Sequence, residues 1–260
     1  MRHARAFGFA GLAVLAVAAA AAIAQTTVTP VPEAAPVESA PLDAAAAAAA
    51  LATAKGGDPQ AGATKAGACA ACHGLDGNAT DPTLYPRLAG QSERYIARQL
   101  TLFKTGERAN PIMQPFAAAL SAQDMRDIGA YFATHKSGAG IADDTVIASG
   151  PNQGLKFYEV GQKLYRSGDT TRGIPACMAC HGAAGTGNPG PAYPHVGGQQ
   201  SWYTARRLQE YRAGTTTEKD PTLFHVMSSV AKSLTDEEIQ SLSSYMQGLH
   251  ARPETGGGKG

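Results

Sequence analysis

The sequence predicts an all-α protein built from two homologous helical repeats in tandem. The chain of 260 residues repeats a set of motifs at nearly constant spacing. Apolar residues in both copies recur at helical intervals, and the alternating patterns of strands are weak throughout. A composition of 43% hydrophobic and 17% charged residues is typical of a globular protein. The net charge of +1 lacks the basic surplus of a nucleic-acid-binding protein, so nucleic acid is not expected as a partner.

The N-terminus has the pattern of a secretion signal. Arg2 and Arg5 form a positive region, residues 6–22 are almost entirely apolar or small, and an A-x-A cleavage site follows at residues 22–24. The competing interpretation is a retained membrane anchor, because the apolar run approaches spanning length. Its richness in alanine and the small residues at the cut favour cleavage. We therefore expect residues 1–24 to be a signal peptide of an exported protein.

Composition divides the rest of the chain into segments. A stretch dominated by Pro, Ala, Thr and Glu, without aromatic residues, is typical of a disordered linker, although its alanine run at 44–50 can form a short helix with no amphipathic face to dock it. The expected segments are the linker at 25–57, the first repeat at 58–136, a second linker at 137–152, the second repeat at 153–250 and a flexible tail at 251–260.

The two repeats align in a register that changes once. At an offset of 108 residues, CAACHG at 69–74 falls on CMACHG at 177–182, and the match continues to Gly106, which falls on Gly214. Six extra residues then enter the second repeat, and the offset becomes 114 up to its end. The first repeat has been copied whole, with one insertion.

Each repeat carries a similar set of helices. SERYIARQLTLF at 92–103 has apolar residues at helical spacing. Ser121 followed by Asp124, and Thr235 followed by Glu238, are capping patterns that predict the start of the last helix in each repeat. A helix is also expected before each C-x-x-C pair. Because a repeat of about 80 residues has a marginal core of its own, something else must help to fill it.

The motif C-x-x-C-H occurs once in each repeat and is the attachment signature of c-type haem. Two thiols three residues apart reach two vinyl groups of one porphyrin and form thioether links, and the following histidine supplies a nitrogen to the iron. We expect these roles for Cys69, Cys72 and His73 and for Cys177, Cys180 and His181. The alternatives are a shared Cys₄ zinc site and a thioredoxin-type redox pair. The two pairs lie more than a hundred residues apart in separate repeats, which disfavours one shared zinc. A redox pair does not require the histidine that follows both pairs, so haem is favoured.

The second axial ligand can be chosen by comparing the repeats. Outside the motifs, no histidine falls on a histidine of the other repeat, which disfavours bis-histidine ligation in both. Met125 falls on Ile239 and Met246 on Phe132, as core positions do. The methionines that match each other are Met113 and Met227, at 40 and 46 residues after the motif histidines. His/Met ligation closes the iron, which indicates an electron carrier and not an enzyme.

A proline follows each motif histidine by 13 residues, as Pro86 and Pro194. Its carbonyl can accept a hydrogen bond from the outer imidazole nitrogen and fix the ring. The alternative is an ordinary turn proline.

With these motifs, the chain resembles the cytochrome c4 family of dihaem cytochromes over about residues 58–250. The resemblance rests on CAACHG, YPRLAGQSERYIARQL, MQPFAAALSAQDMRDIGAYF and their second copies. It implies two class I cytochrome c domains related by pseudo-twofold symmetry, two covalent haems, and Met113 and Met227 as ligands. It also implies a periplasmic monomer that exchanges electrons with redox proteins such as quinol–cytochrome c reductase and a terminal oxidase, with membrane-surface contact.

Two other classes of function stay open from the sequence. One is the haem subunit of a flavocytochrome or of another dehydrogenase complex, which has a similar fold. The other is a dihaem enzyme, such as a peroxidase or a thiosulfate dehydrogenase. An enzyme of that kind usually needs one iron with an exchangeable or unusual ligand, whereas both repeats here offer the same methionine and no fifth cysteine exists. The long segment 25–57 departs from the family and leaves a flexible arm or a membrane tether open.

Overall fold

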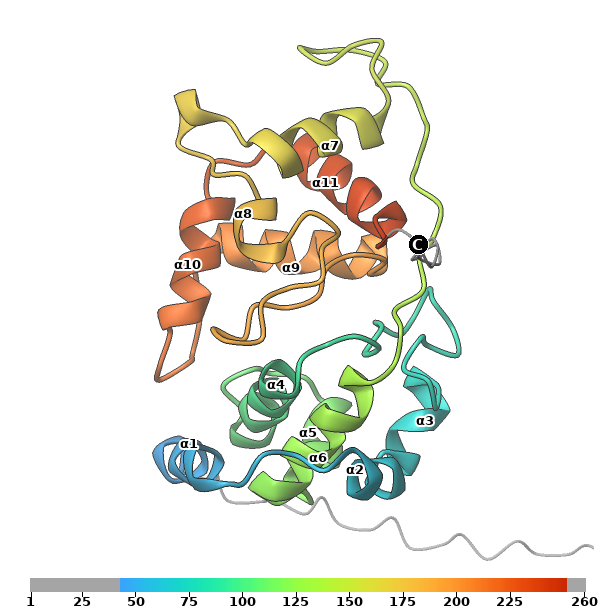
Figure 1. The fold of residues 1–260 in the computed structure, drawn as a ribbon. Coiled ribbons are helices and arrows are strands. Elements are labelled where there is room, and N and C mark those ends of the chain that lie inside the picture. The colour runs from blue at the N-terminus through green and yellow to red at the C-terminus, as the bar shows by residue number, and fades with distance from the viewer. Residues whose placement is uncertain (1–42, 252–260) are drawn as a thin grey trace, which may run out of the picture. The chain divides into compact units, whose positions relative to one another are not determined.

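The computed structural model describes residues 43–251, which are mainly helical (Figure 1). The described residues all belong to one compact unit. Within the described residues there are three isolated β-bridges and no strand, which agrees with the all-α class. No helix in this part of the chain is long and apolar enough to cross a membrane. The expected signal peptide and nearly all of the expected tail lie outside the described residues.

The described helices follow the two repeats in order (Figure 1). Those at the N-terminal end are α1 (Ala44–Thr53), α2 (Pro59–Lys65), α3 (Gly67–His73), α4 (Glu93–Thr105), α5 (Met113–Ala118) and α6 (Ala122–Ala133). Those of the second repeat are α7 (Phe157–Ser167), the 3₁₀ turn η1 (Thr170–Arg172), α8 (Met178–His181), α9 (Ser201–Ala213), α10 (Thr222–Ala231) and α11 (Asp236–Gly248).

The helix starts expected from the sequence are present. The Ser92 hydroxyl accepts a hydrogen bond from the Tyr95 backbone N–H at 3.3 Å and begins α4. Ser121 and Thr235 each form a capping box with the acidic residue three positions on, at the starts of α6 and α11. The boxes fix where the last helix of each repeat begins.

In both repeats a glycine lets the last helix cross the helix before the C-x-x-C pair. A Cβ atom on Gly62 of α2 would lie 2.0 Å from the Asp127 carbonyl oxygen of α6. A Cβ on Gly161 of α7 would lie 2.0 Å from the Ser241 carbonyl oxygen of α11. Figure 1 shows α7 beside α11 in the second repeat. Only a residue without a side chain allows this backbone approach.

Each repeat has its own apolar core. In the first, Ile128 and Phe132 of α6 are fully buried against α4. In the second, Ile239 and Leu242 of α11 are fully buried against α7 and α9. The stripes expected from helical spacing therefore form the cores. Met125 and Met246 are buried there, as the repeat comparison predicted for core methionines.

The described part of the expected linker at 25–57 is more ordered than we predicted. Asp43 caps α1, and the Arg126 guanidinium of α6 donates to the Leu51 carbonyl at 3.1 Å. The Leu51 side chain packs against the first core. These two contacts dock α1 without an amphipathic stripe. Residues 25–42 lie outside the described residues.

The two repeats contact each other through equivalent loops in a reciprocal way. The Gln91 side chain donates to the His195 carbonyl at 2.7 Å and accepts from the His195 N–H at 3.0 Å. The Gln199 side chain makes the same pair of bonds with the backbone of Arg87, at 3.0 and 2.9 Å. Gln91 and Gln199 are copies of each other, as are Arg87 and His195. Such exchange of partners is the mark of a twofold relationship.

Candidate haem sites

The C-x-x-C-H motifs lie on short helical turns in both repeats. Cys69 and Cys72 lie on α3, which ends at His73. Cys177 is the N-cap of α8, which contains Cys180 and ends at His181. Residues three apart on a helical turn share one face, so each pair presents two thiols on the same side. The four cysteines of the chain are all described and none forms a disulfide.

Both motif histidines are held by the proline carbonyls named from the sequence. The His73 Nδ1 lies 2.9 Å from the Pro86 carbonyl oxygen, and the His181 Nδ1 lies 3.0 Å from that of Pro194. A carbonyl can only accept, so each Nδ1 carries the proton and each Nε2 has a free lone pair. The functional interpretation of these prolines agrees with the structure.

Burial lowers the pKa of both His73 and His181, and the hydrogen bond to the proline carbonyl offsets part of this effect. Both rings are therefore neutral near pH 7, the form that can bind a metal. Tyr85 and Tyr193, just before the prolines, place their rings 6.2 Å from the histidine rings, measured between centroids. The repeated Tyr-Pro unit thus contacts each histidine by its ring and its carbonyl.

In the second repeat, the predicted site residues line one cavity. Cys177, His181 and Met227 lie on its wall together with Cys180. The remaining wall is mainly apolar and includes Pro175, Tyr193, Phe224, Val226 and Val230. An apolar cavity with two thiols, a neutral imidazole and a thioether fits a haem.

In the first repeat, Cys69 and Met113 pack against the same core. Met113 is the first residue of α5, and its N–H donates to the Asn110 side chain at 2.9 Å. Met113 and Met227 are both half-buried, whereas Met125 and Met246 are buried. The two matching methionines are therefore less buried than Met125 and Met246, although both pack against the edge of a core.

A partly exposed ionic network positions the segment that leads into each motif, and in each repeat one of its carboxylates is buried. In the first repeat, the Lys65 ammonium group lies 2.6 Å from a carboxylate oxygen of Asp124 and 2.6 Å from one of Asp127. Hydrogen bonds from Lys65 and Ser121 lower the pKa of Asp124 to about 2. Because Lys65 is four residues before Cys69, this network ties the start of the motif to α6.

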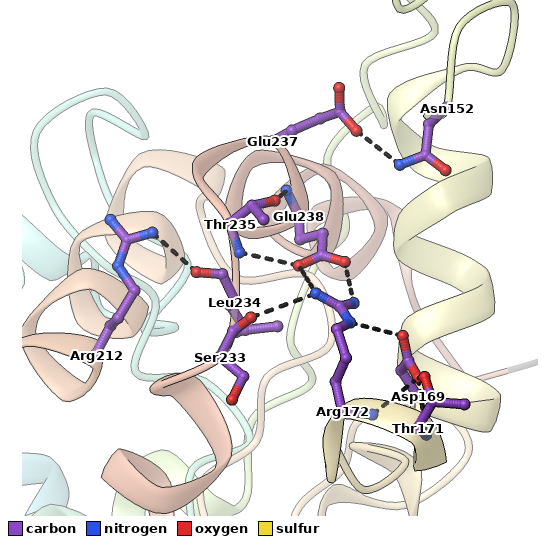
Figure 2. Close-up of polar contacts among 10 residues, drawn as sticks. All are labelled: Asn152, Asp169, Thr171, Arg172, Arg212, Ser233, Leu234, Thr235, Glu237 and Glu238. Carbon is purple, nitrogen blue, oxygen red and sulfur yellow. Dashed lines mark hydrogen bonds and ion pairs between the residues drawn. The ribbon is translucent and has the colours of Figure 1, made fainter. Parts of the chain in front are cut away.

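The second repeat has a different network with the same effect (Figure 2). Arg172 of η1 lies between Asp169, 2.7 Å from its Nε, and Glu238 of α11. Burial alone would raise the pKa of Glu238, but the hydrogen bonds from Arg172 and Thr235 outweigh it and lower the pKa. Arg172 is five residues before Cys177, so η1 and α11 are held together beside the motif.

The sequence did not reveal that one repeat contributes to the cavity of the other. Tyr95 and Arg98 of α4, in the first repeat, line the cavity of the second together with His181. A contact across two copies has no signal in their alignment. Within residues 43–251, no three His, Cys, Asp or Glu side chains gather into a metal cluster, so the two C-x-x-C pairs do not meet in one zinc site.

Comparison with known proteins gives consistent matches over both repeats. Residues 59–136 and 158–250 match the family described as Cytochrome c. Cytochrome c4 of Pseudomonas aeruginosa is 41% identical over 182 residues, which are 70% of this chain and 84% of that protein. The crystal structure of reduced recombinant cytochrome c4 from Pseudomonas stutzeri matches with a TM-score of 0.66 at 39% identity, covering 75% of this chain and 100% of that one. A thiosulfate dehydrogenase electron acceptor from Stutzerimonas stutzeri is 36% identical over 189 residues, 73% of this chain and 82% of that protein.

Proposed function

Because the chain belongs to the cytochrome c family, as a dihaem cytochrome of the c4 type, we propose that it carries single electrons in the periplasm from the respiratory chain to a terminal oxidase. Its cofactors are two c-type haems, one for each cytochrome c repeat. The N-terminal signal pattern supports export, and the two neutral imidazoles with free Nε2 atoms support iron ligation.

The proposed assignment gives each repeat the same four roles. The thiols of C-x-x-C would attach the porphyrin, and the following imidazole would bind the iron through its free Nε2. A methionine thioether would be the second protein ligand of the iron. The attaching cysteines are Cys69, Cys72, Cys177 and Cys180, and the ligands are His73, Met113, His181 and Met227. The observation that carries this assignment is the cavity that holds Cys177, Cys180, His181 and Met227 together.

A bound haem supplies a one-electron iron couple. The residues around it decide whether small molecules react there. A thioether raises the reduction potential relative to a second imidazole and leaves no open position for peroxide or oxygen. The wall of the second cavity is mainly apolar, and the proline carbonyls keep each imidazole in one orientation. These features suit a carrier with no substrate chemistry of its own.

A second candidate is an electron acceptor for a periplasmic dehydrogenase. The relative named thiosulfate dehydrogenase electron acceptor favours it, since 73% of this chain aligns with that protein. The two candidates share the haem sites and differ in the donor. Reduction of the purified protein by a quinol–cytochrome c reductase supports the first, and reduction by a thiosulfate dehydrogenase alone supports the second.

The ligand assignment is tested with methionine-to-leucine variants of the holoprotein, because leucine removes the sulfur at nearly constant volume. Met113→Leu and Met227→Leu should each open one of two irons, so that cyanide or carbon monoxide binds to half of the haem. Met125→Leu and Met246→Leu are the matched controls and should leave both irons closed. Visible spectra report the binding. If the first pair binds no faster than the wild type, the assignment is wrong.

A further inference from the structure

The six extra residues of the second repeat lie in a segment that reaches the first repeat. Between α9 and α10, residues 215–220 read TTTEKD. The Glu218 carboxylate forms an ion pair with Arg98 of α4. The Thr217 hydroxyl donates to the Glu107 carbonyl at 2.7 Å, and the Lys219 N–H donates to the Glu107 carboxylate. We call residues 215–220 the clasp.

The ion pair of the clasp forms part of the wall of the second cavity. Arg98 and Glu218 both line the space that holds Cys177, His181 and Met227. The Glu218 side chain is 6% exposed and that of Arg98 is 24% exposed. A carboxylate so deeply buried is stable only with its partner, because an unpaired buried charge is strongly unfavourable. Arg98 therefore determines whether the clasp stays against α4.

The other repeat has no such contact, although it has the same arginine. Arg206 is the copy of Arg98, and it pairs with Glu210 of its own helix at 3.5 Å. Both of these side chains are more than two-fifths exposed, at 46% and 42%. The first repeat also has six fewer residues after Gly106, and its Glu107 contacts Thr217 and Lys219 of the clasp. The reciprocal loops are symmetric, but the clasp is not.

We propose that the clasp fixes the two repeats together and closes the second haem cavity, with Arg98 as the positioning residue that holds it. This inference rests on the proposed function only in placing a haem in that cavity. The clasp makes the two sites inequivalent, since the second is covered by a segment that the first lacks.

The clasp itself is tested by hydrogen exchange in the holoprotein, a readout that does not depend on the iron ligands. In Arg98→Ala the backbone amide of Lys219 should exchange at least tenfold faster than in the wild type, a change of about 1.4 kcal/mol. Arg206→Ala is the matched control and should leave this amide unchanged. Arg98→Lys should restore part of the protection. Unchanged exchange in Arg98→Ala, or equal acceleration in both alanine variants, overturns the clasp.

Closure of the cavity is tested by the rate of cyanide binding to opened irons. Arg98→Ala should raise the rate several-fold in a Met227→Leu background and leave it unchanged in a Met113→Leu background. If Arg98→Ala does not change the cyanide binding rate in the Met227→Leu background, the clasp does not close the second cavity. If Met227→Leu binds no cyanide at all, the proposed ligand fails, and hydrogen exchange at Lys219 still decides the clasp.

Discussion

Replacing Gly161 with alanine tests whether the close crossing of α7 and α11 stabilises the second repeat. The added Cβ would lie 2.0 Å from the Ser241 carbonyl oxygen and 2.5 Å from its carbon. Real Cβ atoms essentially never approach within 3.0 Å of such atoms, so the two helices must separate locally by about 1 Å. The obstacle is backbone and cannot rotate away.

This separation weakens one of the best-packed contacts of the second repeat. Tyr165 of α7 is fully buried, and Val160 and Leu164 are 6% exposed. Overpacking of a core by one methyl group costs about 1–3 kcal/mol, and a backbone clash belongs at the upper end. The higher helix propensity of alanine relative to glycine offsets about 1 kcal/mol of this cost. We expect a net loss of about 2 kcal/mol, which lowers the melting temperature of a repeat this size by roughly 10 °C.

The assay is thermal and denaturant unfolding of the oxidised holoprotein, followed by circular dichroism. Gly62→Ala should behave like Gly161→Ala, because its Cβ would also lie 2.0 Å from a carbonyl oxygen of the last helix. Gly67→Ala is the control, since nothing lies within 4 Å of its Cβ position in α3. The control should be neutral or slightly stabilising. Equal stability of Gly161→Ala and Gly67→Ala would refute the crossing argument.

Two further predictions concern the ionic networks beside the motifs. The lowered pKa of Asp124 means that its contribution is complete above its unfolded pKa of about 3.9 and is lost as the pH falls toward about 2. In Lys65→Met the free energy of unfolding should therefore fall less steeply over that pH range than in the wild type, as measured by urea titrations at several pH values. Arg172→Met leaves Glu238 buried with fewer donors and should cost about 2 kcal/mol at neutral pH. A denaturation midpoint of Arg172→Met equal to that of the wild type would contradict this second prediction.

The sequence predicted those parts of the molecule in which the two repeats keep one register. Met113 and Met227 were distinguished from the core methionines because both positions keep a methionine in the two copies. Pro86 and Pro194 were found in the same way, and their carbonyls contact the motif histidines. A residue required by local chemistry must recur at a fixed distance from the motif, so comparison of the copies finds it.

The glycine crossings were missed because the register breaks before the motifs. Gly62 is 7 residues before Cys69, whereas Gly161 is 16 residues before Cys177. The extra residues form the turn that contains Arg172, and they hide the equivalence of the two glycines. Docking of α1 was missed for another reason. Its contact depends on Leu51 and a backbone carbonyl, and neither gives a periodic signal.

Contacts between the repeats include some that both copies share and some that the insertion adds. Gln91 and Gln199 make reciprocal bonds because both copies kept the same residue. Arg98 and Arg206 were also kept, yet only Arg98 meets an acidic partner in the other repeat. The difference lies in chain length, since only the second repeat has enough residues after α9 to place Glu218 beside α4. The two equivalent arginines thus have different partners. The segment that covers the second cavity comes from the insertion and not from the duplicated motifs.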